Sequence, residues 1–488
     1  MSPQDDIVQA LERYKAYLTE DEYQALLSES DRIAPSAVRL NLLKAQKPAP
    51  KRLRELADKY GWQCEDLAFS EDSFQVFDAQ TSPSQTLEFL LGQYYIQDAA
   101  SILPVSLFSK PEKPLLKLDM AASPGGKTTQ MIDASLDRDF VIANDSSASR
   151  LSALRTVLQT WGATNYAITN YAGERWGDWF PETFDQILLD APCSMQSLRA
   201  SSTHPHRPIT NDERGRLASR QTALLISAGK ALKVGGELVY STCTLAPEED
   251  EAVLSVLLEA YPTCFEVDKQ FAQKYQIKGL TEFENQTFHP DVIHSLRIWP
   301  FVFQTNGFFA VKINKVKSLP SENSPAPFRE FRLTGYSHIS QNLVNYIQTF
   351  IEDVYGINFN ALLEAHSLVA MRKEDLIHLV PLAYLENFAT LPYNAIGMLL
   401  GKFIKDKLEL SPDIVLRFGP QFQKNIWEIP SELIEQWLKG FDIRGIEPPD
   451  IQLGTVIALR DAEGNNLGPA KASKGRLRNL LPNRHLRI

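Results

Sequence analysis

The stretch that decides the fold of this chain is Leu115–Gln130, LLKLDMAASPGGKTTQ. It begins with a short apolar run that ends in Asp119, and a loop of small residues with a Pro-Gly-Gly turn follows. From Lys127 onward the residues are typical of the start of a helix. A strand, a small-residue loop and a helix in this order favour the ligand-binding turn of an α/β sheet. In such a turn glycines let a ligand approach the backbone, and the first helical turn offers free N–H groups.

Two classes of ligand fit this loop. Ala121–Thr128 has the pattern A-x-x-x-x-G-K-T, one glycine short of a P-loop, so a phosphate is one candidate. A nucleoside is the other, because Phe140–Asp145 (FVIAND) ends in an acidic residue placed to hold ribose hydroxyls. Pro124 argues against the phosphate, since its ring nitrogen has no N–H to donate. A purely structural turn is the third interpretation.

Length and composition limit the class of protein. The 488 residues predict roughly two to four domains, and 44% hydrophobic residues are enough for real cores. No apolar run is long enough to span a bilayer, and the acidic start MSPQDDIVQALERY is unlike a signal peptide. The four cysteines form no C-x-x-C pair, so we expect a cytoplasmic protein that needs no metal. The net charge of −10 does not indicate nucleic-acid binding and does not exclude it, because binding depends on a local basic surface.

Strand and helix patterns alternate after Leu115 and predict a right-handed α/β sheet. The predicted strands are Leu115–Asp119, Phe140–Asp145, Tyr166–Asn170, Phe184–Asp190 and Glu237–Cys243. The predicted helices are Lys127–Leu136, Ser147–Trp161, Asn211–Leu232 and Pro247–Tyr261. Phe301–Gln304 and Phe308–Ile313 are expected to close the sheet as a hairpin.

The remaining chain suggests further domains on either side of this sheet. We expect a small α+β domain at 1–110, the sheet at 111–315, a Ser- and Pro-rich linker at 316–330, a mostly helical subdomain at 331–400 and short strands at 401–488. The tail from Gly468 has no acidic residue and six basic ones: Lys471, Lys474, Arg476, Arg478, Arg484 and Arg487.

Two cysteines and an aspartate follow predicted strands. FDQILLDAPC places Asp190 at the carboxyl end of a strand, with Cys193 just beyond it, and ELVYSTC presents Cys243 in the same way. The carboxyl ends of parallel strands meet at one edge of a sheet, so we expect these three groups to lie beside the ligand loop. Either thiol alone is more typical of a buried structural cysteine, whereas the pair favours chemistry. Further zinc ligands at suitable spacing are lacking.

These motifs resemble the Nop/Sun family of S-adenosylmethionine-dependent RNA cytosine-C5 methyltransferases. The segments that carry the resemblance span roughly 35–315: AVRLNLLK, GQYYIQDAAS, AASPGGK at 121–127, Asp145, DAPCS at 190–194, STC at 241–243, and Arg297…Pro300…Gly307-Phe308-Phe309-Ala310. The tail, LG-x-x-K followed by GRLRN-x-LP, resembles the PUA-like RNA-binding domain of the bacterial branch, which methylates small-subunit ribosomal RNA.

The resemblance implies a class I, Rossmann-like methyltransferase core between an N-terminal domain of RNA-binding type and C-terminal helical and PUA-like parts. By match to STC, Cys243 is the nucleophile that adds to C6 of cytosine and makes C5 reactive toward the sulfonium methyl. Asp190 would hydrogen-bond N3 of the base, and Cys193 would assist elimination.

The same resemblance implies a cofactor and a partner. S-adenosyl-L-methionine would be held by Ala121, Ala122, Ser123, Pro124, Gly125, Gly126, Lys127, Asp145, Ala172 and Asp190. The expected partner is RNA, ribosomal RNA before transfer RNA, with no membrane, and no oligomer is implied.

Two departures from the family pattern leave other functions open. Met195-Gln196-Ser197 replaces the usual Gly-x-Gly after DAPCS, and Ala172 stands where an acidic residue is expected near the adenine. One alternative is a P-loop-type NTPase with FDQILLD as its Walker-B-like strand. The other is a non-catalytic RNA-binding protein on a methyltransferase scaffold.

Overall fold

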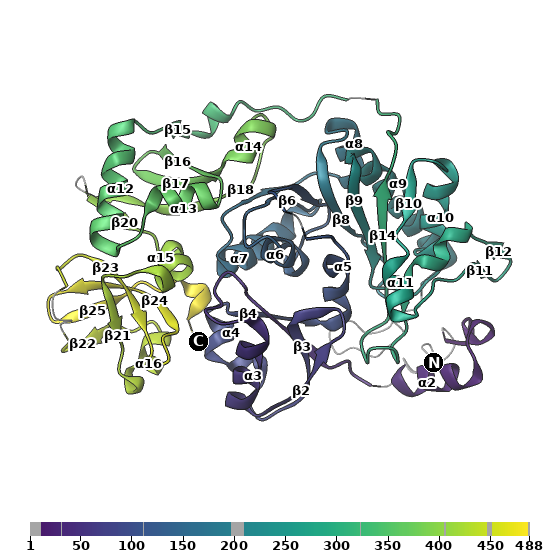
Figure 1. The fold of residues 1–488 in the computed structure, drawn as a ribbon, viewed down its shortest axis with the longest axis horizontal. Coiled ribbons are helices and arrows are strands. Elements are labelled where there is room, and N and C mark those ends of the chain that lie inside the picture. The colour runs from purple at the N-terminus through teal and green to yellow at the C-terminus, as the bar shows by residue number, and fades with distance from the viewer. Residues whose placement is uncertain are drawn as a thin grey trace.

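The computed structural model describes residues 11–30, 32–110, 112–196, 209–322, 324–404, 407–446 and 451–486. In these ranges the strands form a nine-stranded sheet, a four-stranded sheet, two five-stranded sheets and a two-stranded ribbon, β11 (Glu282–Phe283) with β12 (Gln286–Thr287). Figure 1 shows the large sheet in the middle, the N-terminal sheet below it and the C-terminal sheets to the left.

The central sheet has a parallel middle and antiparallel edges. In spatial order its strands are β10 (Phe265–Val267), β14 (Phe308–Lys315), β9 (Leu232–Thr242), β8 (Phe184–Asp190), β5 (Leu116–Asp119), β6 (Phe140–Asn144), β7 (Tyr166–Thr169) and β18 (Ala395–Ile396), with β13 (Leu296–Ile298) paired to β14. Strands β5, β6, β7, β8 and β9 run parallel to one another, whereas β14 runs antiparallel to β9 and β18 antiparallel to β7. Parallel strands are buried on both faces, which explains their nearly continuous apolar sequences.

Helices cover both faces of this sheet. They are α5 (Leu103–Ser106), α6 (Gly126–Asp133), α7 (Leu151–Trp161), α8 (Trp176–Trp179), α9 (Asn211–Ala231), α10 (Glu251–Ala260) and α11 (Gln270–Tyr275). Side chains alternate along β6, so Val141 packs in a core with α7 and Ile142 in the core that includes residues of α9. The α/β fold class is confirmed, and every predicted strand and helix between Leu115 and Tyr261 is present with small shifts of its ends.

The predicted closing hairpin is wrong in its first strand. Phe301–Gln304 forms no strand, and β13 (Leu296–Ile298) pairs with β14 instead. All three residues of β13 are buried, and it has only three residues, too few for a periodic pattern to stand out.

The N-terminal sheet is antiparallel and lies against the central one. Its order is β2 (Trp62–Leu67), β3 (Ser70–Ala79), β1 (Ser36–Leu40) and β4 (Tyr94–Asp98), with α3 (Ala49–Tyr60) and α4 (Leu87–Leu90) beside it. The preceding α2 (Glu20–Ser30) lies apart from this sheet (Figure 1). Tyr14 and Leu26 pack in the central core, and Tyr14 Oη donates to the Leu245 carbonyl at 2.7 Å. The first helical segment therefore belongs with the central sheet.

The region 331–400 is not mostly helical, which corrects the prediction. It holds α12 (Gln341–Tyr355), α13 (Phe359–Ala365) and α14 (Leu382–Asn387). It also holds most of an antiparallel sheet in the order β15 (Ser337–His338), β16 (Leu368–Lys373), β17 (Leu376–Pro381), β19 (Met398–Ile404) and β20 (Lys407–Leu410). The expected boundary at 400 falls inside β19. The strand β18 extends the central sheet, and Phe388 stacks on Phe184 at 5.6 Å.

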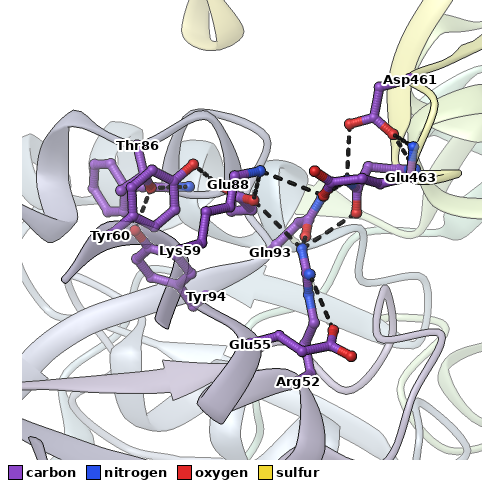
Figure 2. A network of polar contacts seen from close by, with 12 residues as sticks. Arg52, Glu55, Lys59, Tyr60, Thr86, Glu88, Gln93, Tyr94, Asp461 and Glu463 are labelled. Atoms are coloured by element: carbon purple, nitrogen blue, oxygen red, sulfur yellow. Dashed lines mark hydrogen bonds and ion pairs between the residues drawn. The ribbon is translucent and has the colours of Figure 1, made fainter. Parts of the chain in front are cut away.

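The last sheet follows α15 (Pro412–Phe418). Its order is β21 (Ile426–Glu428), β23 (Val456–Arg460), β24 (Asn466–Ser473), β25 (Arg476–Asn479) and β22 (Ile443–Arg444), with α16 (Ser431–Leu438) alongside. Figure 2 shows how the loop between β23 and β24 meets α3 and α4, the helices beside the N-terminal sheet. Fully buried Glu88 lies 3.2 Å from Lys59 Nζ, and Lys59 also pairs with Glu463 at 3.4 Å. Arg52 donates to Asn465 Oδ1 at 3.2 Å. These contacts join the N-terminal domain to the C-terminal sheet.

Candidate active site

The loop between β5 and α6 is tightly held on both sides. Ala122 N donates to the Asn144 carbonyl of β6 at 2.8 Å. Gly125 has a φ of +117°, and a Cβ there would lie 3.0 Å from Val157 of α7. A Cβ on Gly126 would lie 2.8 Å from Gln97 Oε1 of β4. Glycines are therefore required for the loop to fit between α7 and β4.

A cavity of about 230 Å³ opens along this loop. It is lined by Tyr95, Ile96, Gln97, Ser101, Asp119, Ala121, Ala122, Ser123, Pro124, Gly126, Lys127 and Asp190. The structure thus brings the predicted loop residues, except Gly125, to one cavity together with Asp190. Sequence reasoning missed Tyr95, Gln97 and Ser101 as lining residues, although the GQYYIQDAAS segment that contains them was the available signal.

Two buried polar atoms at this cavity fit the polar end of an amino acid such as methionine. Gln97 Nε2 and Asp119 Oδ1 have no hydrogen-bond partner within the described residues. The other Asp119 oxygen accepts from Thr128 Oγ1 at 2.7 Å, and burial raises the pKa of Asp119 to about 7. An amide donor and a carboxylate acceptor without partners suit the carboxylate and ammonium groups of an S-adenosylmethionine molecule.

Asp145 and Ala172 lie outside the lining of this cavity. Asp145 is buried, and its two oxygens accept backbone N–H groups from Ser147 at 2.8 Å and Ser123 at 3.2 Å. Asp145 therefore ties the loop to the turn after β6. Ala172 is exposed after the end of β7. Their predicted contacts with the cofactor stay predictions.

The two thiols and the carboxylate lie together at the same edge of the sheet. Cys193 Sγ and Cys243 Sγ are 3.1 Å apart. Asp190 accepts from Ser241 Oγ at 2.8 Å through one oxygen and from Lys127 Nζ at 2.8 Å through the other. The cause is the parallel pairing of β8 with β9, which sets Asp190 opposite Ser241 just before each strand ends.

Burial and neighbouring charges set the protonation of this cluster. The hydrogen bond with Cys243, followed by burial, raises the pKa of the Cys193 thiol well above its usual value. Burial opposes the charge of Lys127, but the Asp190 carboxylate outweighs it and raises the pKa of Lys127. Cys193 is therefore held as a thiol, and Lys127 and Asp190 as an ion pair.

The segment after Cys193 is the first departure from the family pattern. Met195 has a φ of +59° and a side chain that is 45% exposed. Gln196 accepts a hydrogen bond from Leu245 N at 3.1 Å, and Ser197 lies outside the described residues. A positive φ favours glycine, so Met195 adopts here a backbone conformation suited to the family's usual residue.

Acidic neighbours partly neutralise the basic tail. Lys471 pairs with Glu409, Arg476 with Asp442 and Arg484 with Asp413. Within the described residues Lys474 and Arg478 are exposed and form no ion pair, and Arg487 lies outside them. The exposed positive charge of the tail is therefore smaller than its sequence suggests.

Two other features are absent from the described ranges. No group of three His, Cys, Asp or Glu side chains is arranged to hold a metal ion. No helix in those ranges has the length and apolar character needed to cross a membrane.

Known proteins of similar sequence and structure identify the family of this chain. The family model described as 16S rRNA methyltransferase RsmB/F matches residues 107–314. The ribosomal RNA small subunit methyltransferase F of Shewanella oneidensis is 30% identical over 96% of this chain and 93% of its own length. That of Aeromonas salmonicida is 31% identical over 86% and 85%. A methyltransferase homologue from Pyrococcus horikoshii of known crystal structure has a TM-score of 0.55 and 29% identity, over 65% of this chain and 99% of its own.

The central sheet and the loop after β5 define a class I methyltransferase with a Rossmann-like core. Within that class the chain belongs to the RsmB/F family of S-adenosylmethionine-dependent RNA methyltransferases. The interpretation as a P-loop NTPase is therefore wrong, and the loop explains why: Lys127 binds Asp190, and Pro124 cannot donate to a phosphate.

Proposed function

We propose that this protein methylates C5 of a cytosine in small-subunit ribosomal RNA through a covalent bond between Cys243 and C6 of the base. The observation that carries the proposal is the pair of sulfur atoms 3.1 Å apart, with Asp190 at the same strand ends and beside the cavity. The names of the relatives supply the class of RNA.

Each residue has a step in this mechanism. The Cys243 thiolate adds to C6, and the displaced electron pair moves to N3, which takes a proton from Lys127 through Asp190, because Lys127 and Ser241 both donate to that carboxylate. C5 then becomes nucleophilic, and S-adenosylmethionine supplies its electrophilic methyl group. A water molecule takes the C5 proton, the electron pair reforms the C5–C6 double bond, and the C6–S bond breaks to release Cys243 as a thiolate, while the N3 proton returns to Lys127 through Asp190. Cys193 Sγ lies 3.1 Å from Cys243 Sγ, so its thiol can donate to the departing thiolate and assist this elimination.

The cofactor would lie along the β5–α6 loop. We assign its methionine end to Gln97 Nε2 and Asp119 Oδ1, which have no hydrogen-bond partner within the described residues, and its ribose to the region of Asp145. Ala172 has only a backbone contact to offer the adenine. A nucleotide base in a duplex must also be unstacked before Cys243 can reach it.

The substrate is tested with RNA from a strain that lacks this protein. Purified protein, radiolabelled S-adenosylmethionine and either small-subunit ribosomal RNA, assembled small subunits or transfer RNA are incubated, and bisulfite sequencing locates the methylated cytosine. We expect one protected cytosine in small-subunit RNA. Methylation of transfer RNA alone would contradict the substrate proposal. Cofactor binding without methyl transfer to any RNA would support a non-catalytic scaffold.

The chemistry is tested by substituting the two cysteines separately. Cys243→Ala is expected to abolish methyl transfer and form no covalent species, because addition comes first. Cys193→Ala is expected to transfer the methyl group and then stall with protein attached to RNA. Denaturing electrophoresis shows the complex as a nuclease-sensitive shift. A shift with Cys243→Ala only would reverse the two roles, and no shift with either variant beside an active wild type would exclude the covalent route.

A further inference from the structure

The backbone on both sides of Cys193 is held by two side chains that the mechanism does not use. Gln221 Nε2 of α9 donates to the Pro192 carbonyl at 2.9 Å, just before the cysteine. Glu249 Oε2 accepts from Ser194 N at 2.9 Å, just after it. Gln221 Nε2 also donates to Glu249 Oε2 at 2.9 Å, which closes the two contacts into one clamp around Cys193.

The loop that carries Cys193 has no regular structure of its own to fix it. Residues 191–196 follow β8 without forming a helix or strand. Cys243 differs, because it comes immediately after β9, and the Leu245 carbonyl accepts from Arg297 and Tyr14 at 2.8 and 2.7 Å. The clamp of Gln221 and Glu249 therefore holds the backbone on both sides of Cys193. Two further contacts join this loop to the residues after Cys243: Ser194 Oγ lies 3.1 Å from Thr244 Oγ1, and Leu245 N donates to the Gln196 carbonyl at 3.1 Å.

Packing alone does not explain these two polar side chains. Both have no exposed surface, and Gln221 Oε1 and Glu249 Oε1 have no hydrogen-bond partner within the described residues. Burial of unpaired polar atoms costs stability, and apolar side chains of similar volume would avoid that cost. Burial also raises the pKa of Glu249, which shows that its environment disfavours the charge.

We propose that Gln221 and Glu249 are positioning residues that aim Cys193 at the covalent complex for the elimination step. This inference rests on the proposed function, because it assigns the clamp to the step in which Cys193 acts. A thiol misplaced by about 1 Å can slow its step by roughly a hundredfold while other steps keep their rates. Loss of the clamp is therefore expected to slow release of the RNA rather than methyl transfer.

The test compares Gln221→Leu and Glu249→Leu with a matched control, Gln186→Leu. Gln186 is also a buried glutamine with two hydrogen bonds, to the Ser109 carbonyl at 3.0 Å and Glu237 at 2.8 Å. It pairs with Glu237 four positions before the Asp190–Ser241 pair at the strand ends, and it lies outside the cavity lining. Small-subunit ribosomal RNA and radiolabelled cofactor are mixed with excess enzyme. Methyl transfer in the first turnover and the lifetime of the protein–RNA adduct are measured, and urea unfolding confirms that each variant is folded.

We expect both clamp variants to transfer the methyl group at nearly the wild-type rate and to hold the adduct about tenfold longer or more. The control is expected to match the wild type in both measurements. The double variant Gln221→Leu/Cys193→Ala is expected to have the same adduct lifetime as Cys193→Ala, since both changes act on the Cys193 thiol. The inference would be overturned if the clamp variants lost methyl transfer and adduct formation equally, or if they behaved like Gln186→Leu. If Gln221→Leu does not fold, Glu249→Leu decides it.

The Cys193→Ala variant separates this failure from failure of the proposed function. An adduct that accumulates in Cys193→Ala but not in the clamp variants would refute the clamp alone. No adduct in Cys193→Ala, with an active wild type, would refute the covalent mechanism and the clamp together.

Discussion

At the scale of single residues, the ionisation of Asp119 at the cofactor cavity makes the stability of the folded protein depend on pH. It is 1% exposed at the end of β5, and burial raises its pKa from an ordinary 3.8 to about 7. In the unfolded chain this carboxyl loses its proton near pH 4, whereas in the folded protein it keeps the proton until about pH 7. The contribution of Asp119 to stability is therefore complete below pH 4 and is lost as pH rises to 7.

Asp119→Asn is expected to remove this loss of stability between pH 4 and pH 7. A shift of about three units corresponds to at most about 4 kcal/mol, so the free energy of unfolding should fall less between pH 4 and pH 7 in the variant than in the wild type. Urea unfolding of both proteins at pH 4, 5.5 and 7 measures the difference. Parallel curves would mean that Asp119 ionises normally in the folded state.

The same scale shows how far the site could be predicted from sequence. Asp190, Cys193 and Cys243 were placed at one edge because strand ends are readable from apolar runs that stop at a polar residue. Gln97 and Gln221 were missed, since they reach the site from β4 and α9, and only the tertiary fold brings them there. The roles of all these residues stay predictions until the variants are measured.

At the scale of elements, one buried ion pair joins β1 to α6. Arg39 Nη1 lies 2.6 Å from Asp133 Oδ2, and Arg39 Nη2 donates to the Gly126 carbonyl at 3.0 Å. Both side chains are fully or almost fully buried, and burial raises the pKa of Asp133 to about 7 even beside the arginine. The N-terminal sheet thus holds the first turn of the helix that follows the cofactor loop.

Arg39→Met is expected to destabilise the protein by about 3–5 kcal/mol, because it leaves Asp133 buried without its partner. The double variant Arg39→Met/Asp133→Leu should recover most of this loss, since it removes both charges. Urea unfolding gives the free energies, and calorimetry of S-adenosylmethionine binding shows whether the loop loosens. A double variant no more stable than Arg39→Met would show that the hydrogen bonds, rather than the unpaired charge, dominate.

Elements differed in how well their sequences predicted them. The parallel strands were found because burial on both faces makes them rich in apolar residues, as in Phe140–Asn144 (FVIAN). The sheet of β16, β17 and β19 was missed because its strands mix charged and apolar residues, as in Leu368–Lys373 (LVAMRK), beside helices with clear periodicity. The two-residue β18 forms only through its pairing with β7, which no local pattern records.

At the scale of the whole molecule, the C-terminal part is built into the core. β18 extends the central sheet, and buried His485 donates from Nδ1 to the Leu90 carbonyl of the N-terminal unit at 2.7 Å. Arg417 Nη1 donates to the Leu43 carbonyl at 2.6 Å. A deletion from about residue 400 would cut β19 and expose the core beneath it, so loss of RNA binding by such a protein would not locate the RNA surface. Charge substitutions on the intact chain are the better test.

Lys474 and Arg478 are the basic tail residues that remain exposed without an ion pair in the described chain, whereas exposed Arg476 on the same hairpin pairs with Asp442 at 3.0 Å. Each cation that contacts a phosphate releases counterions, so its loss lowers the slope of log affinity against log salt by about 0.7–0.9. Lys474→Ala/Arg478→Ala is therefore expected to weaken binding of small-subunit ribosomal RNA and lower the slope by roughly one to two.

Arg476→Ala is the matched control for this prediction. Asp442 already compensates the Arg476 charge, and its removal would leave a carboxylate near the RNA, so affinity is expected to fall with less change in slope than in the double variant. Binding measured by filter retention at several salt concentrations gives both quantities. Adduct formation at saturating RNA should be unchanged, because the tail is far along the chain from the thiols and lies on a different sheet. A double variant with the wild-type slope would place the RNA surface elsewhere on the molecule.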